Sequence, residues 1–287
     1  MIPLKDDAPR IGTPFINYTL LLLNIVAFFF EISLNSAARQ QVVFAFGVVP
    51  ARFTVVFFNH GYVPWNLISD LGTRYVPAAG AIVPVFTSMF LHGSWLHLIF
   101  NMWALWIFGD NVEDYLGHTL YLFFYLICGV AAALLHALFN IGSTVPSVGA
   151  SGAIAGVMGA YLILFPRARV LTLVLFCLVL YKWLPDWIVF AFALIGIAMC
   201  ILFAVKPQAS LLKFLRIFLF FFLWLPAWIV LGYWFIAQFL SGAASSIAQH
   251  GSNSSGIAFW AHVGGFIAGV VLVKLFPVRT RRYHYGM

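Results

Sequence analysis

Residues 118–139 read HTLYLFFYLICGVAAALLHALF, a run of 22 residues that contains no lysine, arginine, aspartate or glutamate. About 20 predominantly apolar residues are enough for an α-helix to cross the hydrocarbon core of a bilayer. Runs of similar character, some of them shorter, occur on both sides of this one, at residues 14–34, 95–108, 151–165, 217–240 and 257–276. The pattern predicts an all-α polytopic membrane protein.

The composition of the whole chain agrees with this prediction. The chain has 287 residues, of which 63% are hydrophobic and 8% are charged. Soluble domains carry about 25% charged residues, so a cytosolic enzyme is excluded. The 15 lysines and arginines outnumber the 8 aspartates and glutamates, but they stand in small groups between the apolar runs. Such groups are typical of positive-inside topology in a lipid bilayer, and they do not indicate a partner among the nucleic acids.

The boundaries of the membrane domain follow from the same pattern. Residues 1–13 are predicted to form a cytoplasmic tail, residues 14–276 the membrane domain, and residues 277–287 a basic cytoplasmic tail. Residues 36–93 are too polar to cross a bilayer and too apolar for a linker. We expect them to lie in the membrane interface and to be partly helical. A short acidic turn is expected at residues 110–114, directly after one apolar run.

The segment 170–205 contains two further apolar runs, separated by Lys182–Asp186. Placing the basic groups before and after this segment in the cytoplasm requires an even number of crossings between them. We therefore predict a helical hairpin, inserted at about residues 170–214, whose turn faces outward. Eight spans with both termini in the cytoplasm result.

Four polar residues lie in or at the ends of the apolar runs, where polar side chains are costly and call for an explanation. His97 and Asn101 are spaced i and i+4, so they share one face of a helix. Ser151 opens a short helix, and His262 stands near the start of the last apolar run. These four residues are the candidates for a functional site.

Ser151 has two interpretations. Serine is a common N-cap, and Gly152, Gly156 and Gly159 have the small-residue spacing that lets membrane helices approach closely. Alternatively, Ser151 is a nucleophile at a helix N-terminus, where free N–H groups and the helix dipole favour a developing oxyanion. The sequence alone leaves both interpretations open.

A serine nucleophile needs an adjacent base, and His262 is the obvious candidate. It lies three residues before Gly265, which forms a GxxxG face with Gly269 on the same helix. Packing of this face against the glycine-rich helix of Ser151 would bring the imidazole to the hydroxyl. The alternative is a histidine at a helix end that bonds a loop carbonyl. Apart from Glu31, no acidic residue lies near the outer halves of these helices, so no buried carboxylate partner for His262 is evident.

His97 and Asn101 can both present N–H donors to an oxyanion. An ordinary interhelical hydrogen bond is the alternative. A metal site is not expected: the chain has eight histidines but no HExxH sequence, and its only glutamates are Glu31 and Glu113. Among the other histidines, His92 is expected nearest to the site. The rest are interpreted as interface or loop residues, namely His60, His118, His136, His250 and His284.

Four stretches of the chain together resemble the rhomboid family of intramembrane serine proteases. They are residues 89–102 (MFLHGSWLHLIFNM), 106–114 (WIFGDNVED), 149–152 (GASG) and the AH of 261–262 with Gly265 and Gly269. Each motif is weak or moderate alone, but their combination in this order on membrane helices is highly specific. The resemblance covers about residues 8–169 and 215–276.

The resemblance implies a six-helix core in which Ser151 is the nucleophile and His262 the base. It also implies an oxyanion hole formed by His97, Asn101 and the backbone N–H of Ser151, with Gly149 in the loop near the substrate. The reaction needs no metal or organic cofactor. The implied substrates are single-span membrane proteins that are cut near the outer face, and the implied location is the inner membrane of the cell.

Two departures from the family pattern stand out. Some members have a tyrosine one turn after the serine that stacks on the catalytic histidine, and here that position is Ala155. About 40 residues, Leu171 to roughly Phe214, are interposed between core helices 4 and 5, which is where the hairpin is predicted. Two other classes remain: an inactive rhomboid-like scaffold, against which the presence of both Ser151 and His262 argues, and a transporter, for which no inverted repeat is visible.

Overall fold

The computed structural model describes residues 1–173, 222–248 and 258–276. The chain divides into two compact units. The smaller unit comprises residues 1–7 and 167–230, and the larger one comprises residues 8–166 and 231–287.

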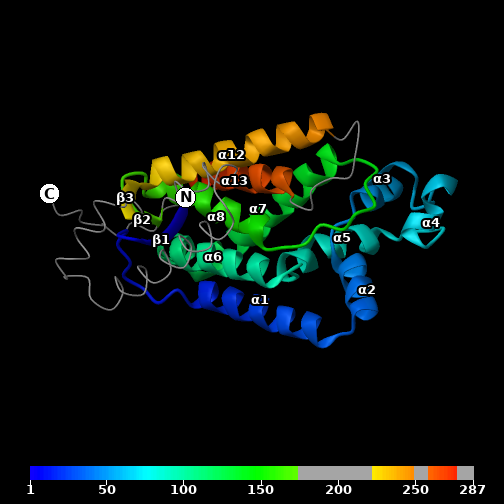
Figure 1. Ribbon diagram of the computed structural model, residues 1–287, viewed down its shortest axis with the longest axis horizontal. Coiled ribbons are helices and arrows are strands. Elements are labelled where there is room, and N and C mark those ends of the chain that lie inside the picture. Colours follow the sequence, from blue (N-terminus) through cyan, green and yellow to red (C-terminus); the bar gives the residue numbers. More distant parts are fainter. Residues whose placement is uncertain (174–221, 249–257, 277–287) are drawn as a thin grey trace, which may run out of the picture. The chain divides into compact units, whose positions relative to one another are not determined.

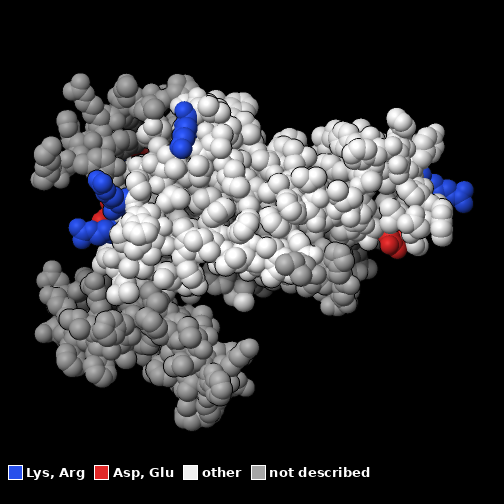
Figure 2. Space-filling model, turned by 90° about the horizontal axis from the view of Figure 1, so that it is seen from above, with Lys and Arg blue, Asp and Glu red and all other residues white. Residues whose placement is uncertain are grey.

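The larger unit is a bundle of apolar helices (Figure 1). Its main helices are α1 (Phe15–Ser33), α6 (Trp95–Leu116), α7 (His118–Phe139), α8 (Ser151–Leu164), most of α12 (Ala227–Ala248) and α13 (Phe259–Leu275). Within the described residues, α1, α7 and α12 are each long and apolar enough to cross a bilayer, whereas α8 and α13 are shorter apolar helices. In Figure 2 most of the described surface is uncharged, with only a few Lys, Arg, Asp and Glu side chains in view. The predicted polytopic helical membrane protein is confirmed.

The expected interfacial stretch is indeed partly helical. It contains α2 (Ser36–Phe46), α3 (Pro50–Phe58), η1 (Trp65–Leu67), α4 (Ile68–Leu71), α5 (Ala78–Thr87) and η2 (Ser88–Phe90). Val49, Ala51 and Val55 are buried in a small hydrophobic cluster within this stretch. Residues 78–90 and helix α6 are long and apolar enough to cross a bilayer only when taken together, and the chain bends by 79° between them.

Helix α13 is packed most tightly against α8. A Cβ atom added at Gly265 would collide with the carbonyl oxygen of Gly152, and one added at Gly269 would collide with that of Gly156. We call these four glycines the glycine interface. The two backbones therefore approach as closely as residues without side chains permit, as the small-residue spacing predicted.

The acidic turn expected at residues 110–114 does not form, because α6 continues to Leu116. The reason is long-range. Glu113 is buried and accepts hydrogen bonds from the backbone N–H groups of Ile16 and Asn17, at 2.8 and 2.6 Å. A carboxylate from α6 thus satisfies the free donors at the N-terminus of α1, where helix geometry leaves N–H groups without partners and favours negative charge.

The smaller unit contains a three-stranded antiparallel sheet in the order β1 (Ile2–Asp6), β2 (Arg169–Leu173), β3 (Phe222–Pro226). Ile2 pairs with Leu173, which also pairs with Phe222. The fold is therefore mostly helical but not entirely so.

The sheet corrects three expectations. Residues 1–13, expected to form a tail, contain β1. The predicted hairpin was expected to begin as helix at Val170, which instead belongs to β2. The run 217–240, expected to be one span, contains β3, and helix α12 begins only at Ala227 and continues to Ala248. Each strand obtains its backbone partners from a distant segment, so no local sequence pattern predicts the strand. The rest of the predicted hairpin lies outside the described residues.

Candidate active site

Ser151 and His262 lie in direct contact although 111 positions separate them in the chain. The Nε2 atom of His262 is 2.8 Å from the Oγ atom of Ser151. Ser151 is the first residue of α8, and His262 lies in the first turn of α13. The glycine interface between these helices begins beside both residues, since Gly152 follows the serine and Gly265 is one turn after the histidine.

The N-cap interpretation of Ser151 is wrong. The residue that caps α8 is Ala150, and no side chain makes a capping hydrogen bond there. The hydroxyl of Ser151 is instead engaged by the imidazole. As the first helical residue, Ser151 also has a backbone N–H that no carbonyl within the helix can accept.

The second nitrogen of His262 has its own partner, which the sequence analysis missed. Nδ1 lies 2.7 Å from the Oε1 atom of Gln238 on α12. The ring of Trp234, one turn before Gln238, lies 5.6 Å from the imidazole between centroids. These two residues of α12 therefore contact His262 from outside α8. Ala155, one turn after Ser151 on α8, has no ring that could do so. The signal available in the sequence was a glutamine in an apolar run.

The loop before Ser151 packs against the side chain of His97. Gly149 has a φ of +131°, a conformation that residues with a side chain rarely adopt, and its N–H donates to the carbonyl of Ser88 at 2.8 Å. A Cβ atom on Gly149 would lie 2.7 Å from Cε1 and Nε2 of His97, and 3.6 Å from the hydroxyl oxygen of Ser151. The imidazole of His97 therefore packs against the backbone of this loop.

Asn101 follows His97 on the same face of α6. Its side chain is 7% exposed, and within the described part of the chain its Nδ2 atom has no hydrogen-bond partner. Buried amide donors are normally paired, so this N–H group is free to donate to an acceptor that comes within reach. The interhelical hydrogen bond considered for this residue is not observed at Nδ2.

Several polar contacts hold the loop that leads into α6. Ser94 caps the helix by accepting from the N–H of His97 at 3.2 Å. Glu31 accepts from the N–H of His92 at 2.9 Å, and Arg39 donates to the carbonyl of His92 at 3.0 Å. The rings of His92 and His97 are 5.1 Å apart between centroids, so His92 lies beside one of the candidate site residues.

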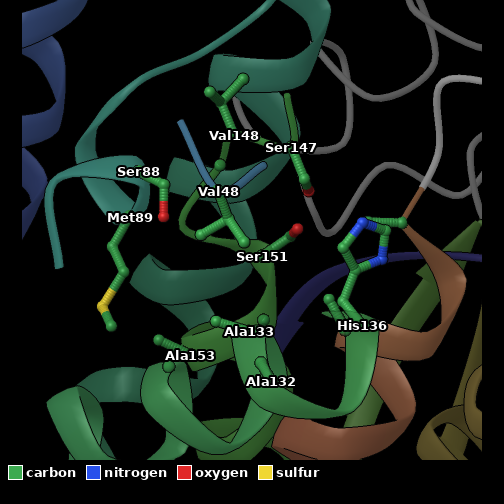
Figure 3. A pocket seen from close by; sticks show the side chains of 15 residues that line it. Val48, Ser88, Met89, Ala132, Ala133, His136, Ser147, Val148, Ser151 and Ala153 are labelled. Atoms are coloured by element: carbon green, nitrogen blue, oxygen red, sulfur yellow. The ribbon is translucent and has the colours of Figure 1, made fainter. Parts of the chain in front are cut away.

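A small cavity of about 30 Å³ adjoins the serine (Figure 3). Its lining includes Ser88, His136 and Ser147 as well as Gly149 and Ser151. Figure 3 shows the hydroxyl of Ser151 directed into this space, between Ser88 and His136. A volume of this size, with these polar groups in an otherwise apolar lining, has room for about one or two water molecules.

His136 was interpreted as an interface or loop residue, but it lines the cavity beside Ser151. It lies in the last turn of α7, where Asn140 donates to its carbonyl at 2.8 Å. No group of three histidine, cysteine, aspartate or glutamate side chains suited to a metal ion occurs among the described residues. The arrangement as a whole provides a hydroxyl, a base, several N–H donors and space for water.

Comparison with known proteins connects this geometry with one family. A sequence model described as the rhomboid domain matches residues 79–211. Rhomboid protease AarA of Providencia stuartii is 31% identical over 166 residues, which cover 53% of this chain and 52% of that protein. Rhomboid protease GluP of Bacillus subtilis is 30% identical over 151 residues, which cover 53% of this chain and 25% of GluP.

A mitochondrial relative is similar over a shorter stretch. Rhomboid protein 1, mitochondrial, of Saccharomyces cerevisiae is 35% identical over 96 residues, which cover 32% of this chain and 28% of that protein. The chain thus matches little more than a quarter of this relative and about half of AarA. Relatives occur in both bacteria and mitochondria.

Proposed function

The chain belongs to the rhomboid family, and we propose that it is an intramembrane serine protease with Ser151 as nucleophile and His262 as general base. The observation that carries the proposal is the 2.8 Å contact between Nε2 of His262 and Oγ of Ser151. A serine hydroxyl becomes an effective nucleophile when a base at this distance takes its proton.

The proposed reaction has two stages. First, Oγ of Ser151 attacks the carbonyl carbon of a peptide bond while its proton passes to Nε2 of His262. The tetrahedral intermediate then breaks its C–N bond, and His262 returns the proton to the departing amine. In the second stage, water attacks the resulting ester with His262 again as base, which releases the acid and restores the hydroxyl.

The oxyanion of each tetrahedral intermediate requires donors that are in place before the reaction. The backbone N–H of Ser151, the amide of Asn101 and the imidazole of His97 are the proposed donors. Two observations support this assignment: the Nδ2 atom of Asn101 is buried without a partner in the described structure, and the ring of His97 packs against Gly149. The cavity of about 30 Å³ beside Ser151 provides space for the hydrolytic water.

The proposed substrates are single-span membrane proteins, cut within or near their transmembrane segment. A peptide bond in a regular helix is shielded by its own hydrogen bonds, so a helix-destabilising segment would expose it. Helix α12 contacts α13 through large side chains such as Phe235 and Phe266. Because side-chain contacts can rearrange, we propose that a substrate helix enters between α12 and the rest of the bundle. We propose the inner membrane of the cell as the location.

A serine-reactive fluorophosphonate probe tests the proposal directly. The wild type and Ser245→Ala should be labelled, whereas Ser151→Ala should not. Ser245 is a suitable control because its hydroxyl bonds Gly242 of its own helix at 2.8 Å, away from the cavity. Equal labelling of Ser151→Ala would contradict the proposal. A wild type that is neither labelled nor active on a single-span substrate, yet binds it, would indicate an inactive scaffold instead.

A further inference from the structure

The imidazole of His262 is held from the side opposite the serine by a neutral amide. Nδ1 is 2.7 Å from Oε1 of Gln238, while Nε2 is 2.8 Å from Oγ of Ser151. Gln238 and Trp234 are spaced i and i+4 on α12, so they face His262 together. The imidazole of His262 therefore contacts α12 through Nδ1 and the serine through Nε2.

The chemistry of imidazole makes this second contact important. A neutral imidazole carries its proton on one nitrogen only, and the other nitrogen is the base. For Nε2 to accept the proton of Ser151, Nδ1 must carry the hydrogen. The Oε1 atom of Gln238 is an acceptor, so it stabilises that tautomer and fixes the plane of the ring.

We propose that Gln238 is the positioning residue of the catalytic centre: it accepts the Nδ1–H hydrogen bond of His262 and thereby presents Nε2 to Ser151. This inference rests on the proposed function. It assigns to an amide the orienting role that a carboxylate has in a Ser-His-Asp triad. A carboxylate in this apolar helix would add a charge, whereas an amide orients the ring without that cost.

The hydrogen bond also gains strength during the reaction. When Nε2 takes the proton of Ser151, the ring becomes an imidazolium, and Nδ1–H then donates with a positive charge behind it. Hydrogen bonds from charged donors are about twice as strong as those from neutral ones. Gln238 thus stabilises the transition state more than the resting enzyme, which lowers the barrier rather than only tightening the fold.

Because Gln238 belongs to α12, the state of the dyad depends on the position of that helix. Another side-chain contact of α12 is the hydrogen bond that Nε1 of Trp260 donates to Oγ of Ser246 at 2.9 Å. This last contact joins α12 to α13 without touching His262. It therefore offers a matched control for any effect on helix packing.

The test compares three variants of the full chain in lipid vesicles that contain a purified single-span substrate. Gln238→Met keeps the length of the side chain but removes the acceptor, and Gln238→Glu keeps an acceptor oxygen. Ser246→Ala removes a hydrogen bond between the same two helices. Turnover and KM are measured together with the nitrogen-15 NMR signals of the His262 ring, which report the tautomer.

We expect Gln238→Met to lower kcat by about ten- to hundredfold with little change in KM, the loss expected for one hydrogen bond to a charged group. Its ring spectrum should lose the pure Nδ1–H tautomer. Gln238→Glu should recover much of the turnover and keep that tautomer, and Ser246→Ala should match the wild type in both measurements.

The inference is overturned if Gln238→Met retains wild-type kcat, or if the His262 tautomer is unchanged in it. It is also overturned if Ser246→Ala loses as much activity, because the effect would then belong to helix packing. Failure of the proposed function would be recognised separately, by substrate cleavage that persists in Ser151→Ala. The NMR signals would even then show whether Gln238 holds the ring.

Discussion

Helix α13 has two interfaces that are built in opposite ways. Against α8 it presents the glycine interface, where any added Cβ at Gly265 or Gly269 meets a backbone carbonyl oxygen. Against α12 it presents rings, with Phe235 stacked on Phe266 at 4.6 Å and Trp234 beside His262 at 5.6 Å between centroids. We call the second the aromatic interface.

The difference separates the parts of the site by rigidity. Backbones in direct contact cannot shift without collision, whereas ring contacts can adjust through side-chain rotation. Ser151 and His262 both stand beside the glycine interface, so their mutual distance is fixed. Gln238 belongs to the aromatic interface, so the orientation of the imidazole depends on the more adaptable side.

The largest effect is expected from Gly265→Ala, which places a methyl group against the carbonyl of Gly152. Overpacking of this kind costs about 1–3 kcal/mol, and it separates the two helices next to the dyad. The variant should unfold earlier and lose labelling by the fluorophosphonate probe.

The matched control is Gly232→Ala on α12, where an added Cβ meets nothing within 4 Å. Replacing a helical glycine with alanine in open space should stabilise the fold by about 0.5–1 kcal/mol. Equal unfolding midpoints for both variants would show that the glycine interface is not tighter than the rest of the bundle.

The second test concerns Asn101 on α6, and it asks whether this residue acts in catalysis or only in folding. Asn101→Ala should lower turnover by about 10²–10³, the usual effect of removing one oxyanion donor. Its thermal stability should change little, because Nδ2 has no partner among the described residues. Asn24→Ala, which loses a buried bond to the carbonyl of Leu20 at 2.8 Å, should show the reverse pattern. Early unfolding of Asn101→Ala with full turnover would contradict the catalytic role.

The third test concerns the loop before the serine. Gly149→Ala combines backbone strain at a φ of +131° with a collision against His97. Gly142→Ala, in the same loop, has a φ of +83° and open space around the added atom. Both should lose about 1–3 kcal/mol of stability to strain. Only Gly149→Ala should also lose turnover, by about 10²-fold, because it displaces His97, the proposed oxyanion donor. Similar turnover in the two variants would show that His97 has no role in the reaction.

The smallest effect is expected at the aromatic interface. Phe235→Leu replaces a stacked ring with a smaller apolar side chain and should cost about 0.5–1.5 kcal/mol. Its turnover should stay near that of the wild type, because neighbouring rings can adjust. A loss of stability as large as that of Gly265→Ala would abolish the distinction between the two interfaces.

The sequence indicated those residues of the candidate site that carry a local signal. Ser151, His262, His97 and Asn101 are polar residues at or within apolar runs, where each is conspicuous. The regular spacing of Gly265 and Gly269 indicated which helix faces meet. The close approach of serine and histidine followed from these two local patterns.

The rest depended on contacts between distant segments. The role of Gln238 is not predictable from the sequence, because nothing in its own helix shows that it faces His262. Glu113 was assigned to a turn because its role as a cap for α1 is visible only when the two helices are packed. Strand β1 forms because β2 lies beside it, far along the chain. The inserted hairpin stays a prediction.

The central claim is that Ser151 and His262 act as one unit, and a double-mutant experiment tests it most directly. Turnover of a single-span substrate is measured for Ser151→Ala, His262→Ala and the double variant, each checked for an unchanged unfolding midpoint. We expect three losses of similar size, because the effects of mutating members of a catalytic unit are not additive. Losses that multiply in the double variant would contradict it.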